Sequence, residues 1–346
     1  MSVLTNNLPY TGKILSFGEL LLRFPLDTDG EWLKNNQLPV YVVGAELNVA
    51  NDLCLWGLPV KYFTALPDNI MTGQIIKSLK NNGIDTSSVY YTGNRLGLFY
   101  LTDGQDLKHN GLVYDRGHSA FAEFKPGMID WDKVLEGVSW FHFSAISPAV
   151  SQSAADVCKE VLEIASKKNI TISVDMNYRA KLWQYGKSPL QIMPELVKYC
   201  DLVMGNIWAA ETMLGINVIP GIHEAGQKSV YLKEALKTSE SIIEQFPKCK
   251  IVANTFRFDA TNDIKYYTTL YTGNQLYNSG EYEAGHVVDK AGSGDCFMAG
   301  LIYGFYNNSN DIHEILEFAT AAAFEKLFIK GDATTKTVTD IKKAMK

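Results

Sequence analysis

The sequence predicts an α/β protein whose central sheet is mostly parallel and flanked by helices, with a small β-sheet standing apart from it. From residue 131 onward, short apolar runs of strand length alternate with longer stretches of helical spacing, which is typical of a parallel sheet covered on both faces. Between residues 89 and 120, β-like runs follow one another without an intervening helix, and such runs usually pair as antiparallel strands.

The composition is that of an ordinary globular protein. The chain has 346 residues, 46% of them hydrophobic and 20% charged, which allows one large or two medium domains. A net charge of −6 without a basic stripe argues against nucleic-acid binding. Five dispersed cysteines form no CxxC pair, and no apolar run is long enough for a bilayer. We therefore expect a cytoplasmic protein with neither nucleic-acid nor membrane partners.

The first third of the chain supplies strands, two helices and most of the small sheet. Residues 27–34 are polar and rich in turn formers. A helix from residue 45 stops before Gly57, and Asp68 is a candidate cap for a second helix. The β-like runs expected here cover residues 13–18, 20–24, 40–43, 60–66, 89–92, 97–103 and 111–115. We predict one domain, residues 1–346, with a lid formed by inserted strands at about 20–43 and 89–120.

The remaining two thirds alternate between strand and helix. Gly273-Asn274 is typical of a hairpin turn between two strands. The strands expected here are residues 138–143, 171–175, 202–205, 251–255, 264–271 and 275–278. The helices expected are residues 153–168, 190–199, 207–214, 294–306, 312–328 and 338–345.

One stretch, residues 287–300, is typical of a strand end, a tight turn and a helix start. Gly292 and Gly294 bracket Ser293, so the backbone can bend and leave room for a ligand. A helix N-terminus offers unpaired N–H groups and a partial positive charge, which suits a phosphate. Asp295 at this position is placed to take a proton from a hydroxyl that attacks the phosphate. The alternative is a plain turn in which Asp295 only caps the helix.

Polar residues also follow other strands of the parallel sheet, where ligands bind in such folds. Asp175, Asn177 and Arg179 alternate along an extended segment, so they share one face that suits a polyhydroxy acid. The alternative is a polar loop with an internal Asp175–Arg179 pair. Tyr114 and Arg116 lie two apart on a predicted strand and project together across a cleft. The alternative there is a surface strand with an isolated arginine.

The motif from Asp289 to Asp295 resembles the Asp-Thr-x-Gly-Ala-Gly-Asp sequence of the ribokinase-like (PfkB) sugar kinases, with Lys290 and Ser293 as substitutions. The runs 175–183 and 114–120 are similar to segments of the 2-keto-3-deoxygluconate kinases of that family. The resemblance implies a ribokinase-like three-layer fold and ATP-dependent phosphorylation of a primary hydroxyl. It makes Asp295 the catalytic base and the amides of Gly292, Ser293 and Gly294 the anion hole.

The same resemblance assigns two sides of a site. The sugar-binding residues that it implies are Glu19, Gly44, Asn48, Tyr100, Tyr114, Arg116, Asp175, Asn177 and Arg179. The nucleotide-binding residues that we predict are Asn206, Thr255, Arg257 and Lys290.

Three positions depart from the family pattern. Val43 replaces a glycine beside the sugar, which narrows the predicted pocket. Ala209 replaces a glutamate that helps to organise magnesium, and Glu211, two residues on, faces another side of its helix. Bulky Phe256, followed by Arg257, alters the floor of the nucleotide site. The metal ligands are therefore left unassigned.

The resulting prediction is a kinase for 2-keto-3-deoxygluconate or a similar sugar acid, with ATP, Mg2+ and, by resemblance, an optional monovalent cation. We expect a homodimer through the lid, because open strand edges invite partners. A fructokinase or other ketose kinase is one alternative. A non-catalytic sugar-acid-binding regulator, suggested by Ala209, is another. A nicotinamide dehydrogenase is disfavoured, because no GxGxxG motif follows the first strand.

Overall fold

A computed structural model describes residues 10–27, 29–102, 112–224, 226–259, 264–307, 309 and 311–346. Within these residues the central sheet has nine strands, in the order β14–β13–β12–β11–β10–β9–β1–β4, with β15 beside β13. The strands are β1 (Lys13–Phe17), β4 (Val60–Phe63), β9 (Val138–Ser144), β10 (Thr171–Asp175), β11 (Leu202–Gly205), β12 (Ile251–Asp259), β13 (Ile264–Thr272), β14 (Gln275–Asn278) and β15 (Tyr282–Ala284). All pairings from β4 to β12 are parallel.

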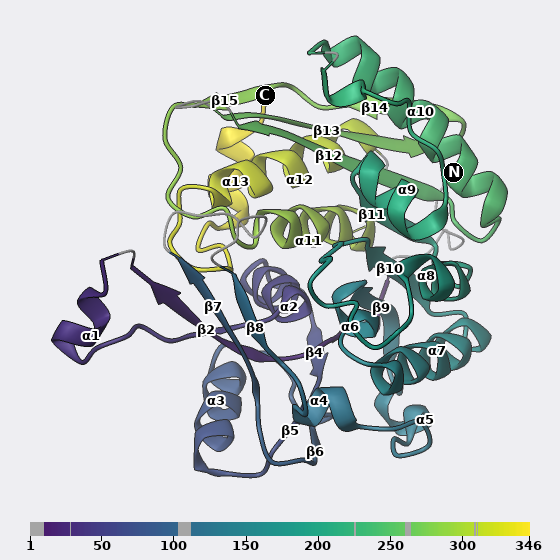
Figure 1. Cartoon of the computed structure of the whole chain (residues 1–346). Coiled ribbons are helices and arrows are strands. Elements are labelled where there is room, and N and C mark those ends of the chain that lie inside the picture. The colour runs from purple at the N-terminus through teal and green to yellow at the C-terminus, as the bar shows by residue number, and fades with distance from the viewer. Residues whose placement is uncertain are drawn as a thin grey trace.

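Helices cover both faces of this sheet (Figure 1). One face packs against α2 (Ala45–Leu55), α3 (Ile70–Asn81), α11 (Ser293–Tyr306), α12 (Ile312–Lys326) and α13 (Val338–Ala344). The other packs against α5 (Trp131–Val134), α7 (Gln152–Lys167), α8 (Pro189–Val197), α9 (Ile207–Leu214) and α10 (Lys228–Gln245). Along β1, Ile14 belongs to the first core and Leu15 to the second, because successive strand side chains point to opposite faces. The predicted three-layer architecture is confirmed.

A separate four-stranded sheet, which we call the lid sheet, stands beside this body (Figure 1). Its order is β3–β2–β7–β8, made of β2 (Leu21–Leu26), β3 (Tyr41–Val43), β7 (Gly97–Thr102) and β8 (Val113–Asp115). It has an apolar cluster of its own around Val43, Phe99 and Leu112. The expected small separate sheet is thus present. Residues 103–111, which complete two of the predicted strands, lie outside the described residues.

One N-terminal prediction was wrong. The run 89–92 does not join the lid sheet: β6 (Tyr90–Tyr91) pairs with β5 (Ala65–Leu66), and the Tyr90 amide donates to the Thr64 carbonyl. The polar, turn-rich segment 27–34 also leads into a short helix that was not predicted, α1 (Glu31–Asn35), which is preceded by Asp27. The Asp27 carboxylate accepts amide hydrogen bonds from this first turn. Local side-chain bonding of this kind is not visible in hydrophobic spacing.

Three other predictions need correction. Asn69, and not Asp68, caps α3, because its side chain exchanges hydrogen bonds with Thr72 in a capping box. Helix α10 was not predicted. It starts after Gln227, whose side chain does not cap the helix, so the sequence has no capping residue to mark the start. Residues 287–288 form no strand. Instead the Val288 and Asp289 amides both donate to the Leu327 carbonyl just beyond α12.

Helices α11 and α12 approach each other closely at two glycines of α11. A Cβ atom on Gly300 would lie 2.5 Å from the Ala319 Cα, and one on Gly304 would lie 2.7 Å from Ile315. Only glycine allows this approach. The shorter helices α4 (Ala120–Glu123) and α6 (Ile146–Ala149) join the strands of the other half. In the described segments, no helix combines the length and the apolar character needed to cross a membrane.

Candidate functional site

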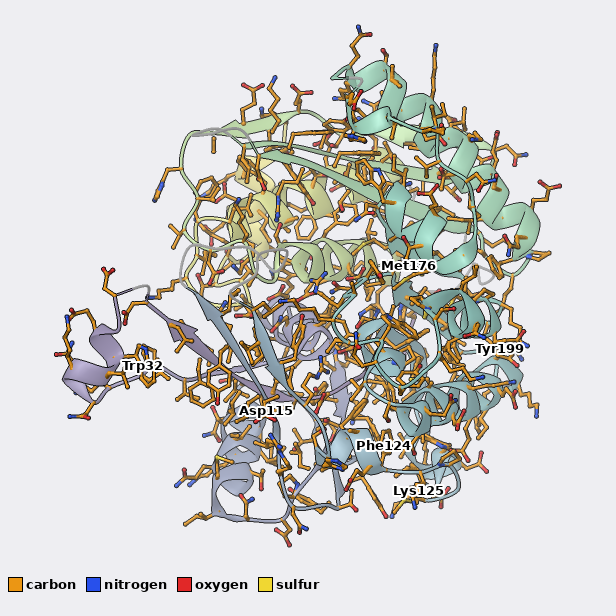
Figure 2. The ribbon with its side chains drawn as sticks, viewed as in Figure 1. Trp32, Asp115, Phe124, Lys125, Met176 and Tyr199 are labelled. Carbon is orange, nitrogen blue, oxygen red and sulfur yellow. The ribbon has the colours of Figure 1, made fainter. Side chains whose placement is uncertain are left out.

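A cavity of about 690 Å³ opens at the carboxyl edge of the parallel strands, between the body and the lid sheet. The turn that follows β10 contributes Met176, which is labelled in Figure 2. Every predicted site residue except Tyr100 lines this cavity. They are Glu19, Gly44, Asn48, Tyr114, Arg116, Asp175, Asn177, Arg179, Asn206, Thr255, Arg257, Lys290, Gly292, Ser293, Gly294 and Asp295.

Tyr100 is the exception, because successive side chains on β7 face opposite ways. Its neighbour Phe99 lines the cavity, whereas the Tyr100 ring stacks on Phe24 at 5.4 Å between centroids. Phe99 therefore faces the cavity, where the resemblance had placed Tyr100. The structure does not bring Tyr100 into the cavity, and its contact with substrate stays a prediction.

The turn before α11 has the geometry of an anion site. Gly292 has φ 77° and lies so close to the C-terminal loop that a Cβ would be 1.6 Å from the Asp332 carbonyl oxygen. Beside Gly294, by contrast, a Cβ would meet nothing within 4 Å. The first helical bond runs from the Cys296 amide to the Gly292 carbonyl, so the preceding amides have no helical partner. They lie at the cavity wall, at the positive end of the helix dipole.

Asp295 does not cap its helix. Its carboxylate accepts a 2.7 Å hydrogen bond from the Asn48 amide of α2, and the α11 N-terminus has no side-chain cap. Burial raises the pKa of Asp295 to about 7, against the lowering effects of Asn48 and Arg179. A carboxylate with this pKa is suited to accept a proton near neutral pH. Burial also raises the pKa of the neighbouring Asp175 well above its usual range, and the Asp295 charge adds to this rise.

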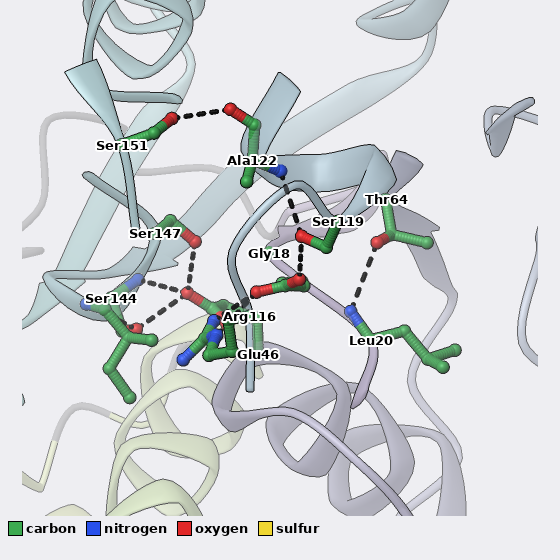
Figure 3. A network of polar contacts seen from close by, with 12 residues as sticks. Gly18, Leu20, Glu46, Thr64, Arg116, Ser119, Ala122, Ser144, Ser147 and Ser151 are labelled. Carbon is green, nitrogen blue, oxygen red and sulfur yellow. Dashed lines mark hydrogen bonds and ion pairs between the residues drawn. The ribbon is translucent and has the colours of Figure 1, made fainter. Parts of the chain in front are cut away.

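A buried ion pair between Glu19, just before β2, and Arg116, just after β8, forms part of the cavity wall (Figure 3). Arg116 contacts the Glu19 carboxylate at 2.5 Å, and the Ser119 hydroxyl donates to the same carboxylate at 2.5 Å. Both charged side chains are almost fully buried. The charge of Arg116 is therefore already compensated within the protein, which the strand pattern of the sequence could not indicate.

Glu46 is a cavity residue that sequence reasoning missed. It lies in the first turn of α2 and accepts hydrogen bonds from the Ser144 amide and the Ser144 and Ser147 hydroxyls (Figure 3). A Cβ on Gly18 would fall 2.0 Å from its carboxylate, so this glycine makes room for Glu46. A lone glutamate in a helix looks like a surface residue in the sequence, and only the fold reveals its partners.

Strand β12 contributes two residues to the predicted nucleotide side of the cavity. Thr255 and Arg257 face the cavity from β12, while Phe256 between them points away and packs on Tyr231 and Tyr267. The prediction that Phe256 alters the cavity floor was therefore wrong. Lys290 lies 3.1 Å from the Asp259 carboxylate at the same end of the cavity.

Helix α9 offers little to a metal ion. The Asn206 side-chain oxygen caps the helix by accepting from the Ala209 amide at 2.8 Å. Glu211 accepts from the Val218 amide and does not line the cavity, so it does not replace the missing carboxylate at Ala209. In the part of the chain that the structure describes, no three His, Cys, Asp or Glu side chains gather as metal ligands.

The sequence matches the model of the pfkB family of carbohydrate kinases over residues 11–337. Among solved structures, the 2-dehydro-3-deoxygluconokinase of Thermotoga maritima is 31% identical, with a TM-score of 0.85 over 96% of this chain and 99% of that chain. The 2-dehydro-3-deoxygalactonokinase of Haloferax volcanii is 28% identical over 174 residues, which span half of this chain and 54% of that protein.

A putative ribokinase II from E. coli, solved in complex with ATP and Mg2+, shares the fold with a TM-score of 0.73. It is 18% identical, and the alignment covers 96% of this chain and 99% of that chain. The family and the ribokinase-like fold predicted from the sequence are confirmed.

The Glu19–Arg116 pair makes a stability prediction. We expect Arg116→Met to lower the free energy of unfolding by about 3–5 kcal/mol, because it leaves Glu19 buried without its counter-ion. Adding Glu19→Gln should recover most of the loss. Urea unfolding measures both variants.

The matched control is Arg95→Met, which breaks the half-exposed Arg95–Asp115 pair of the lid sheet. It should cost less than about 1 kcal/mol. Equal losses in Arg116→Met and Arg95→Met would show that the buried pair has no special role.

Proposed function

This chain belongs to the pfkB family of carbohydrate kinases, and on that basis we propose that it transfers the γ-phosphate of ATP to the primary hydroxyl of 2-keto-3-deoxygluconate or a similar sugar acid. One observation carries the proposal. The buried Asp295 carboxylate, with its pKa raised to about 7, lies in the first turn of α11, whose N-terminal amides line the same cavity. The N-terminus of α11 thus provides both a proton acceptor and an anion site.

In the proposed mechanism, Asp295 accepts the proton of the attacking hydroxyl while Asn48 holds the carboxylate in place. The amides of Ser293, Gly294 and Asp295 stabilise the charge that develops on the transferred phosphoryl group. Phe99 and Tyr114 of the lid sheet, with Arg116 just after β8, line the cavity opposite the body, which supports a role in excluding water. We retain the single kinase domain of residues 1–346 as part of this proposal.

ATP and Mg2+ are the proposed co-substrate and metal. The open space beside Gly294 fits a phosphate, and the described residues provide no cluster of metal ligands. These features suit a magnesium ion that the nucleotide phosphates would hold and whose charge would neutralise theirs. Thr255, Arg257 and Lys290 line the nucleotide end of the cavity.

Arg179 is the best candidate for the substrate carboxylate. It lines the cavity, and its one described hydrogen bond runs to the Tyr178 carbonyl at 3.0 Å. Among the described residues, none of the ion pairs involves Arg179, whereas Arg116 is paired with Glu19. A guanidinium that lines a cavity and forms no direct ion pair among the described residues favours an acidic substrate over a neutral ketose.

Two alternatives remain open to experiment. A fructokinase or other ketose kinase would keep Asp295 and the anion site but would give Arg179 no substrate carboxylate to bind. A non-catalytic sugar-acid-binding regulator is favoured by Ala209, which offers no carboxylate for magnesium. Release of ADP in the presence of the sugar acid excludes the regulator, and binding without ADP release supports it.

We further propose a cytoplasmic homodimer that assembles through the lid sheet. Helix α1, with Trp32 labelled on it, projects from the body (Figures 1 and 2). Leu33, Val40 and Val113 are exposed there by 62, 52 and 54%, and β3 and β8 are edge strands.

The dimer predicts that light scattering gives twice the mass of one chain, and Val40→Lys should lower that mass. A wild-type mass of one chain would contradict the dimer.

The role of Asp295 predicts a pH dependence. Because only the ionised carboxylate accepts a proton, kcat/KM should fall as the pH drops below about 7 and level off above it. Asp295→Asn should lower kcat roughly a hundredfold or more, the usual effect of losing a general base. A coupled ADP-release assay across pH 5–9 measures both. Asp115→Asn, on the lid surface, serves as the control. Full turnover in Asp295→Asn would refute the mechanism.

The role of Arg179 predicts a change in specificity. Arg179→Gln should lower kcat/KM for 2-keto-3-deoxygluconate by roughly ten- to a hundredfold, the loss expected for one charge-assisted hydrogen bond. Turnover of fructose, which has no carboxylate, should change little. An equal loss for both substrates would mean that Arg179 supports the fold or the transition state and does not select the acid.

A further inference from the structure

Lys326, the last residue of α12, is among the largest side chains with no exposure to solvent. A buried ammonium is costly unless protein oxygens surround it. Its Nζ donates to two backbone carbonyls, that of Ile329 at 3.1 Å and that of Asp289 at 3.4 Å. Asp289 begins the stretch that leads to the anion turn, so Lys326 lies directly behind the proposed phosphate site.

The charges around Lys326 come from several elements. Arg23 of β2 contacts the Asp289 carboxylate at 3.0 Å and the Asp332 carboxylate at 3.1 Å. Burial lowers the pKa of Lys326, while the charges of Asp289 and Asp332 raise it and favour the ammonium form. Burial raises the pKa of Asp52, on α2, to about 8, so this acid is mostly neutral at pH 7. Two cations and two carboxylates are thus packed together behind the turn.

This cluster is bonded to the turn itself. The Asp289 carboxylate accepts hydrogen bonds from the amides of Ala291 and Gly331, at 3.0 and 3.1 Å. The Ser293 hydroxyl donates to the Ala323 carbonyl, one turn of α12 before Lys326. Because the Gly292 turn packs against the Asp332 carbonyl, a shift of Asp289 or Asp332 would displace the amides that face the cavity.

We propose that Lys326 is a positioning residue that serves as a built-in monovalent cation for the anion turn. Carbonyl and carboxylate oxygens are the ligands that a hard cation such as K+ takes, and here the lysine ammonium already donates to the carbonyls of Asp289 and Ile329. The residues therefore do not fit the added monovalent cation that the sequence suggested. The ammonium holds Asp289 and the 329–332 loop together and adds fixed positive charge near the phosphoryl group. This inference rests on the proposed phosphoryl transfer.

The test removes the Lys326 ammonium by substitution and then adds a monovalent cation to the buffer. Wild-type turnover should be the same in potassium and in tetramethylammonium buffers. Lys326→Ala should lower kcat roughly ten- to a thousandfold, the range seen when one electrostatic contributor is removed. Potassium or ammonium ions should restore kcat in a saturable way, because they fit the space that the side chain leaves.

Two further variants separate positioning from general stability. Lys326→Met fills the same space without a charge, so it should lose kcat and gain nothing from potassium. Lys61→Ala is the matched control, because Lys61 is also buried and donates to a carbonyl, that of Val134, away from the cavity. It should lower stability without any potassium response in kcat.

A second measurement does not depend on activity. Potassium should raise the unfolding midpoint of Lys326→Ala more than that of wild type or Lys61→Ala, because an ion that binds only the folded state stabilises it. A wild-type enzyme that requires potassium, or Lys326→Ala with unchanged kcat, would overturn the proposal. If wild type phosphorylates no sugar, the proposed function fails, while the potassium-dependent midpoint still tests Lys326.

Discussion

The site depends on one close contact, between Gly292 and the Asp332 carbonyl oxygen. No residue with a side chain fits there, because a Cβ would lie 1.6 Å from that oxygen. The contact lets the chain turn sharply with φ 77° and start α11 at the cavity wall. Asp295 and the unpaired amides then face the same space. The glycine contacts between α11 and α12 and the bonds of Asp289 hold this arrangement from behind.

The buried charges fall into two groups with different consequences. Glu19 with Arg116, and Arg23 with the two carboxylates of Asp289 and Asp332, are compensated inside the protein and hold elements together. Asp295 and Arg179 are bonded to neutral groups, an amide and a carbonyl. The raised pKa of Asp295 follows from this difference, since burial without a bound cation disfavours the charged form. The second group suits the proposed functional roles: Asp295 would accept a proton, and Arg179 would bind the charge of the substrate.

Features that depend on residues close together in the chain could be predicted from the sequence. Three such local patterns are the strand–helix alternation, the 289–295 motif and the Asp175–Arg179 run. Residues of the last two line the cavity. Tyr100 was chosen by family resemblance, whereas the face on which Phe99 and Tyr100 lie depends on the pairing of β7 with β2. Glu46 and Lys326 escaped notice because their partners come from distant segments. Ser144 lies 98 residues from Glu46, and Lys326 lies 37 residues from Asp289. Charged residues in helices give no sign of burial until the fold brings such partners together.

The most direct test is a crystal structure with ADP, aluminium fluoride and 2-keto-3-deoxygluconate, which mimics the transferring phosphoryl group. The account predicts fluoride atoms about 3 Å from the amide nitrogens of Ser293, Gly294 or Asp295. It also predicts the primary hydroxyl of the sugar acid within hydrogen-bond distance of the Asp295 carboxylate. A phosphoryl mimic bound away from these amides, or a sugar whose hydroxyl contacts another residue, would contradict it.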